Sequence, residues 1–143
     1  MINNIQFFTE GIAYRIQGKK KLRRWIIYTA AEENKSTGDI CIILCDDNYL
    51  HKLNRKYLKH NTLTDIITFP LTEEESLISG DIYISLPRVI DNAKKFRQNR
   101  LDELHRVVIH GVLHLIGYND SSAKEKAEMR VKENYYIEKL LIT

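Results

Sequence analysis

The sequence predicts a small α/β (α+β) domain in which a mixed sheet of about four strands is covered by helices. The 143 residues match the size of one ordinary domain, so residues 1–143 are expected to form a single unit with its own core. Hydrophobic residues make up 43% and charged residues 29% of the chain, which is typical of a globular protein and argues against disorder. Segments with strand-like alternation are interleaved with segments of helical periodicity, and this favours the mixed class.

In the first half of the chain, two strands and two helices are expected. Residues 2–8 predict a short strand, and Gly11 predicts a turn after it. Residues 20–33 predict a helix whose buried face carries Leu22, Trp25, Ile26, Thr29 and Ala30. Gly38 is expected to end this region before a buried strand over residues 39–45. Asp46 or Asp47 would cap the next helix, whose apolar face is Leu50, Leu53 and Tyr57.

In the second half, two further strands and three helices are expected. Residues 64–69 predict a strand closed by Pro70, and Gly80 is expected to open a strand with alternating Ile82, Ile84 and Leu86. Pro87 suits the first turn of a helix that carries Val89, Ile90, Ala93 and Phe96. A more apolar helix is expected over residues 101–116, ended by Gly117. A capping box from Ser122 to Glu125 starts the last helix, whose predicted apolar stripe is Ala123, Ala127, Val131 and Tyr135.

The chain is expected to be a cytoplasmic protein. No apolar run is long enough to span a bilayer, and the N-terminus lacks the basic start and apolar stretch of a signal peptide. Cys41 and Cys45 are four residues apart on a predicted strand, which is about 13 Å and beyond disulfide reach. Two buried, unpaired thiols in a reducing compartment are therefore expected.

Positive charge gathers in two short segments, although the formal net charge is only +3. A polyanionic partner such as nucleic acid would fit these clusters, and so would two solvated helix faces. The first cluster is Lys19, Lys20, Lys21, Arg23 and Arg24, and the second is Lys94, Lys95, Arg97 and Arg100.

The segment with the clearest chemistry is His110-Gly-Val-Leu-His114, which lies on the predicted apolar helix. Two histidines four apart differ by about 40° in direction and about 6 Å in height, so both imidazoles can reach one ion. Gly117 lets the chain turn back, and Asp120 can then approach the open side of that ion. Three protein ligands and one water are the pattern of a catalytic metal site. Two hydrogen-bonded histidines and a turn aspartate remain the alternative reading.

The remaining histidines fit this site less well. His105 is about 140° round the helix from His110, and His51 and His60 flank another helix, so hydrogen-bonding or surface roles are expected for them. Metalloprotease helices carry a glutamate directly after the first histidine as general base. Here that position is Gly111, which makes a peptide substrate the least favoured.

Three landmarks resemble the YbeY family of bacterial rRNA-maturation endoribonucleases. They are His110-Gly-Val-Leu-His114-Leu-Ile-Gly-Tyr118, the pair Leu53-Asn54-x-x-Tyr57 and Thr64-Asp65-Ile-Ile-Thr-Phe69-Pro70, and Gly80-Asp81-Ile82. They follow the family's order and cover most of the chain from residue 53 onward. The resemblance implies a zinc-dependent single-strand endoribonuclease that acts in 16S rRNA 3′-end maturation and ribosome quality control, with the ribosome or a ribosomal protein as partner.

The sequence departs from the family at two positions. The family's third ligand is usually a histidine, whereas Asp120 stands at that position and predicts a His110, His114 and Asp120 site for one Zn²⁺ ion or a harder divalent metal. The family usually has an arginine after the tyrosine, whereas this chain has Leu58 followed by Lys59. Lys59 is the substitute candidate for a phosphate contact.

Metal-assisted hydrolysis of an RNA phosphodiester is the leading hypothesis for the function. The attacking group would be a metal-bound water or the RNA 2′-hydroxyl, and no side chain is assigned as general acid or base. Because no aromatic-rich strand face is evident, contacts are expected through phosphates more than through bases. The alternative is a ribosome-associated factor that binds rRNA or protein, with a structural metal and no turnover.

Overall fold

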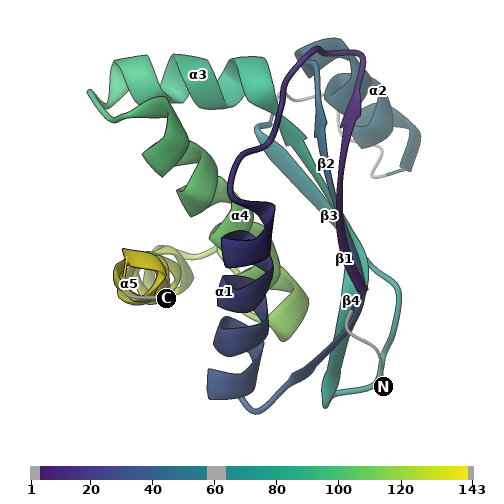
Figure 1. Cartoon of the computed structure of the whole chain (residues 1–143), viewed down its shortest axis with the longest axis vertical. Helices are drawn as coiled ribbons and strands as arrows, with labels where there is room; N and C mark the ends of the chain where they lie inside the picture. Colours follow the sequence, from purple (N-terminus) through teal and green to yellow (C-terminus); the bar gives the residue numbers. More distant parts are fainter. Residues whose placement is uncertain (1–3, 58–63, 142–143) are drawn as a thin grey trace.

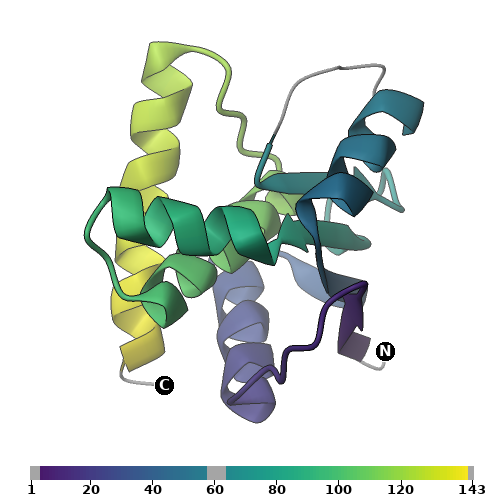
Figure 2. The ribbon, with the colours of Figure 1, turned by 90° about the horizontal axis from the view of Figure 1, so that it is seen from above.

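A four-stranded sheet with helices on both faces forms the structure, a computed structural model that describes residues 4–57 and 64–141 (Figures 1 and 2). The elements follow in the order β1 (Asn4–Glu10), α1 (Lys19–Glu32), β2 (Ser36–Cys45), α2 (Asp47–Tyr57), β3 (Ile66–Pro70), β4 (Leu77–Ser85), α3 (Leu86–Lys95), α4 (Arg100–Ile116) and α5 (Ala123–Leu141). This is the mixed architecture that the sequence predicts.

The sheet has the order β1-β2-β4-β3, so sequence neighbours are not always sheet neighbours. β1, β2 and β4 are parallel, and β3 pairs antiparallel with β4. A parallel connection needs a crossover, and α1 supplies it between β1 and β2. β3 lies at an edge of the described sheet and ends at Pro70, a residue that only an edge position tolerates well.

The two faces of the sheet are covered unequally. α1 packs on β2, α4 packs on β3 and β4, and α5 packs in turn on α1 and α4. α2 covers part of the opposite face, where it contacts β3 and β4 (Figure 1). The main core therefore lies between the sheet and α1 and α4, and its fully buried side chains include Trp25, Ile26, Ile82, Ile109 and Leu113.

Two strands begin earlier than their glycines predict. Gly38 lies inside β2, beside a register irregularity between Thr37 and Ile40. Gly80 lies inside β4, and a Cβ there would be 2.5 Å from the Phe69 carbonyl oxygen and 2.9 Å from a methyl of Leu115. Gly80 is therefore required by the close approach of β3 and α4 rather than by the start of a strand. β4 also ends at Ser85, which caps α3, so that Leu86 belongs to the helix.

The predicted apolar stripe of the last helix is wrong. Val131 is 66% exposed and Tyr135 is 41% exposed, whereas the buried face of α5 consists of Met129, Glu133, Tyr136 and Leu140. That face is nearly opposite to the predicted one. The packing of α5 on α1 and α4 therefore buries the face that carries the Glu133 carboxylate. Tyr57 and Phe96, expected on buried faces of α2 and α3, are also exposed.

The helix caps agree better with the sequence. Of the two candidate caps of α2, Asp46 accepts a hydrogen bond from the Tyr49 N–H at 2.7 Å. Ser122 and Glu125 form the expected reciprocal capping box at the start of α5, with bonds of 3.1 and 3.0 Å.

The cysteines are free, as the spacing predicts. Cys45 is buried, and burial raises the pKa of its thiol to about 12, so that it stays protonated. Cys41 is only half-buried, contrary to the expectation of two buried thiols, because its side chain lies on the sheet face that α2 covers only in part. No helix among residues 4–57 and 64–141 has the length and apolar character needed to cross a membrane.

Candidate metal centre

Helix α4 carries the two histidines and is well defined at both ends. The side chain of Asn99 caps it by accepting hydrogen bonds from the N–H groups of Leu101 and Asp102. Its interior is almost entirely buried against the sheet, α1 and α5. Gly117 ends the helix with a φ of 127°, and the N–H of Tyr118 bonds back to the carbonyl of Leu113 at 3.0 Å. This reversal turns the chain back over the last turn of α4.

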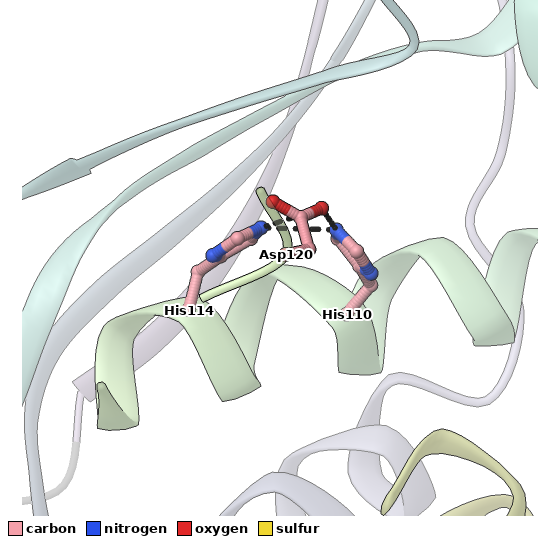
Figure 3. A group of neighbouring side chains, drawn as sticks. All are labelled: His110, His114 and Asp120. Carbon is pink, nitrogen blue, oxygen red and sulfur yellow. Dashed lines mark hydrogen bonds and ion pairs between the residues drawn. The ribbon is translucent and has the colours of Figure 1, made fainter. Parts of the chain in front are cut away.

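The reversal brings Asp120 to the two histidines, as the spacing predicts (Figure 3). The Nε2 atoms of His110 and His114 are 3.0 Å apart. The Asp120 Oδ2 atom is 3.1 Å from Nε2 of His110 and 3.5 Å from Nε2 of His114. These three side chains form a group that could hold a metal ion.

Each imidazole is oriented by a hydrogen bond on its other nitrogen. Nδ1 of His110 lies 2.6 Å from a carboxylate oxygen of Glu133, and Nδ1 of His114 lies 3.0 Å from the carbonyl oxygen of Tyr118. Both partners accept hydrogen bonds, so both Nδ1 atoms carry a proton and donate it. In the neutral imidazoles, which bind metals, the Nε2 lone pairs then point at each other and at Asp120.

This donor set fits a cation. Two nitrogen lone pairs and a carboxylate oxygen converge, and such acceptors repel one another unless a positive charge lies between them. Imidazole and carboxylate are ordinary ligands of Zn²⁺, and three protein ligands leave one coordination position free for a substrate oxygen. The bonds from Glu133 and Tyr118 match the outer hydrogen bonds that fix metal-binding histidines.

Glu133 supplies a buried negative charge next to Nδ1 of His110. It is buried, accepts from Arg106 at 3.0 Å and lies 3.8 Å from Arg130. Burial acts to raise the pKa of Glu133, but its bonds to His110 and Arg106 outweigh burial, so the pKa is lowered and the carboxylate stays ionised.

The two histidines have opposite pKa shifts for this reason. Burial acts to lower the pKa of His110, but the Glu133 carboxylate outweighs it, and the pKa is raised. The pKa of His114 is lowered by burial and by the neighbouring His110. His114 thus favours the neutral form that a metal ligand requires, and Glu133 makes His110 the more basic ligand.

Glu133 is not among the site residues that the sequence predicts. The available signal was its spacing: Glu133 is four residues after Met129 and three before Tyr136, so it shares a helical face with two large side chains. A carboxylate on a buried face requires a charged or hydrogen-bonding partner. The predicted apolar stripe lay on the opposite face of α5, so the face with Glu133 was expected to be exposed.

Two clefts meet at the metal group. One has a volume of about 400 Å³ and the other about 290 Å³, and both are lined by Asp65, His110 and Asp120. The larger cleft also has three cationic side chains, Arg106, Lys126 and Arg130. The group thus lies where the two clefts adjoin, and the larger cleft has cationic side chains beside the carboxylates of Asp65, Glu103, Asp120 and Glu133.

The basic clusters named from the sequence lie elsewhere. The first is on α1, where Arg23 donates to the carbonyl of Ile5, and the second is at the turn between α3 and α4. Phosphate contacts by the first cluster stay a prediction. Lys59 and Leu58 lie outside the described residues, as does His60.

His105 and His51 lie apart from the group, as expected. The ring of His105 packs edge-on against Trp25 with 6.1 Å between centroids. His51 is on α2, on the other side of the sheet.

Gly111 faces the sheet and not the metal group. A Cβ at this position would be 2.7 Å from a methyl of Ile82 and 2.9 Å from a methyl of Ile66. A glutamate here would point into the core, so the position of the metalloprotease base is structurally closed in this fold.

Comparison with known proteins shows the family of this chain. The sequence profile of the family described as Endoribonuclease YbeY matches residues 4–141. The chain belongs to this family. Among its relatives, the Endoribonuclease YbeY of Amoebophilus asiaticus is 46% identical over 134 residues, which are 94% of this chain and 91% of the relative. That of Cytophaga hutchinsonii is 45% identical over 130 residues, 91% of each protein.

A solved structure shows the same fold in a more distant protein. The solution structure of a Thermotoga maritima protein superposes with a TM-score of 0.66 at 31% sequence identity. The match covers 95% of this chain and 88% of that protein. The fold is thus shared over nearly the whole length of this chain.

Proposed function

We propose that this protein is a metal-dependent endoribonuclease that cleaves single-stranded RNA, with one divalent ion, Zn²⁺ first, held by His110, His114 and Asp120. The main support for this proposal is that these three acceptors converge where two clefts meet. Membership of a family named for endoribonuclease activity supports RNA as the substrate.

The residues around the group suit a phosphodiester. The ion, when bound, supplies a Lewis acid for a phosphate oxygen. Arg106, Lys126 and Arg130 place cationic groups along the larger cleft, where they would bind the RNA backbone. Asp65 lines both clefts and would be the carboxylate that accepts a proton from the attacking hydroxyl. Glu133 and the Tyr118 carbonyl keep the histidines oriented.

The nucleophile distinguishes two versions of this reaction. Attack by water leaves ordinary phosphate and hydroxyl ends, whereas attack by the RNA 2′-hydroxyl leaves a 2′,3′-cyclic phosphate. Mass analysis of the cleaved ends, together with a substrate that has a 2′-deoxy sugar at the cleaved position, would assign the version. The deoxy substrate stays intact only if the 2′-hydroxyl attacks.

For the biological substrate we propose the 3′ end of 16S rRNA, in maturation and in ribosome quality control in the cytoplasm, with the ribosome or a ribosomal protein as partner. The resemblance of the three sequence landmarks supports this assignment. Comparison of 16S 3′ ends in cells with and without the protein would test it, and unchanged ends would contradict it.

The enzyme itself is tested by a nuclease assay on single-stranded RNA. The parent protein, His114→Ala and the matched control His51→Ala are compared at equal folded fraction, with bound metal measured by elemental analysis. We expect cleavage and metal to be lost in His114→Ala and kept in His51→Ala. Equal cleavage by all three proteins would indicate a contaminating nuclease and would remove the support for this function.

A second candidate is a ribosome-associated binding factor with a structural metal and no turnover. Asp120 favours it, because a carboxylate in place of a histidine adds negative charge and lowers the Lewis acidity of the ion. RNA binding by the purified, metal-loaded protein without any cleavage would support this candidate over the enzyme.

A further inference from the structure

Four aromatic side chains meet on the sheet face opposite α4, where they line a groove of about 290 Å³ that also includes Leu53 and Asp81. We call this the aromatic groove, and its rings are Tyr49, Tyr57, Phe69 and Tyr83. Tyr49 and Tyr83 stack at 6.1 Å with an interplanar angle of 28°. Phe69 lies edge-on to both Tyr57 and Tyr83 at 5.8 Å.

The groove is assembled from three elements, which is why no single strand reveals it. In the β3–β4 register, Ile67 lies opposite Tyr83 and Phe69 lies opposite Asp81. Strand alternation therefore puts Phe69, Asp81 and Tyr83 on one face. α2 then supplies Tyr49 and Tyr57 from above that face.

The chemistry of the groove suits a nucleobase. Tyr57 is 56% exposed, so its ring offers an accessible surface for stacking. Asp81 offers carboxylate oxygens inside the groove. Lys52 and Lys56 line an adjoining hollow, and the Lys56 ammonium is 5.2 Å from the centre of the Tyr57 ring. Ring faces, one acceptor and two cations at the mouth match a base with its attached phosphates.

The groove and the metal centre lie on the two sides of the edge strand β3, and consecutive residues of this strand line them. Ile66, Ile67 and Thr68 line the cleft that contains His110 and His114, and the next residue, Phe69, lines the groove. From Ile66 to Phe69 the strand rises roughly 10 Å. A strand of RNA that passes over this edge can lie in both places at once.

We propose that the aromatic groove binds an unpaired base of the RNA strand whose backbone continues into the metal centre, with Asp81 accepting from the base's N–H edge. This inference rests on the proposed RNA substrate. Guanine is the base that the groove favours, because its N1–H and N2–H groups are adjacent donors that one carboxylate accepts together. The two acceptors that flank the single N–H of uracil would instead face the charge of Asp81.

The stacking of an RNA base on Tyr57 is tested by measuring RNA binding under conditions that prevent cleavage. Single-stranded octamers of uridine with one central guanosine, labelled with fluorescein, are titrated in a chelator with the parent, Tyr57→Ala and the control Tyr135→Ala. Tyr135 is an exposed tyrosine on α5, which packs on the other side of the sheet. We expect roughly 5- to 150-fold weaker binding by Tyr57→Ala and no change in the control. Equal affinity of Tyr57→Ala and the parent would overturn the inference.

The base preference is tested with Asp81→Asn. The parent is expected to bind the guanosine-containing octamer more tightly than the all-uridine octamer, and Asp81→Asn is expected to lose most of that difference. A parent that binds both octamers equally would refute the role of Asp81. Because binding is measured in chelator, it is separate from catalysis. If the parent cleaves RNA but Tyr57→Ala binds the octamer as tightly as the parent, only the groove is refuted. If Tyr57→Ala binds more weakly but the parent does not cleave RNA, only the enzyme is refuted.

Discussion

Replacement of Glu133 by glutamine is the sharpest test of how the metal centre is built. Glu133 is 7% exposed and accepts from His110 at 2.6 Å and from Arg106 at 3.0 Å. A hydrogen bond to a charged group contributes about 1.5–3 kcal/mol, and glutamine keeps one neutral acceptor for the two donors. We therefore expect Glu133→Gln to lower the free energy of unfolding by about 2–4 kcal/mol.

The same change is expected to weaken metal binding. Loss of an outer partner of a ligating histidine costs about 10- to 100-fold in metal affinity, which equals about 1.4–2.7 kcal/mol. Zinc affinity is measured by competition with a chromophoric chelator, and stability by urea unfolding in excess chelator. The matched control is Glu138→Gln, an exposed glutamate on the same helix. Identical zinc affinities for the two variants would refute the role assigned to Glu133.

Three further changes probe the fold and the ligand set. Gly111→Ala puts a methyl 2.7 Å from Ile82, so overpacking should exceed the gain of about 1 kcal/mol in helix propensity and leave a loss of about 1–2 kcal/mol in urea unfolding; unchanged stability would contradict this close packing. The pKa of Glu33 is lowered below 4.5 because its hydrogen bonds to Tyr118, Tyr136 and Lys132 outweigh burial, so the stability advantage of the parent over Glu33→Gln should be full at pH 7 and disappear as the pH falls through the lowered pKa; an advantage that does not change with pH would contradict this. Asp120→His should keep the bound metal and cleave single-stranded RNA faster, because the ion loses a neutralising carboxylate, whereas a variant that binds no metal would contradict that reasoning.

Much of the fold was predictable because it depends on local periodicity. The buried face of α1 consists of the five residues expected, since a helix with one clearly apolar side has one way to pack. The two histidines and Asp120 were also predictable, because a helical spacing followed by a glycine turn is a local geometric fact.

What the sequence could not decide depended on which surfaces meet. The spacing of α5 allowed two faces, and only its packing on α1 and α4 buried Glu133 behind His110. The same holds for Gly80 and Gly111. Local rules interpret Gly80 as the start of a strand and Gly111 as the position of a missing general base. In the structure, a Cβ at either position would lie within 3 Å of a neighbouring atom, which explains both glycines.

The sequence by itself thus determined the class of fold, the order of its elements and the approach of Asp120 to His110 and His114, because each follows from spacing along one segment. The tertiary structure alone decided the carboxylate that supports His110, the two clefts that meet at Asp120 and the aromatic groove across β3, because each joins side chains from at least two elements. Such contacts are set by packing, which a single segment does not encode.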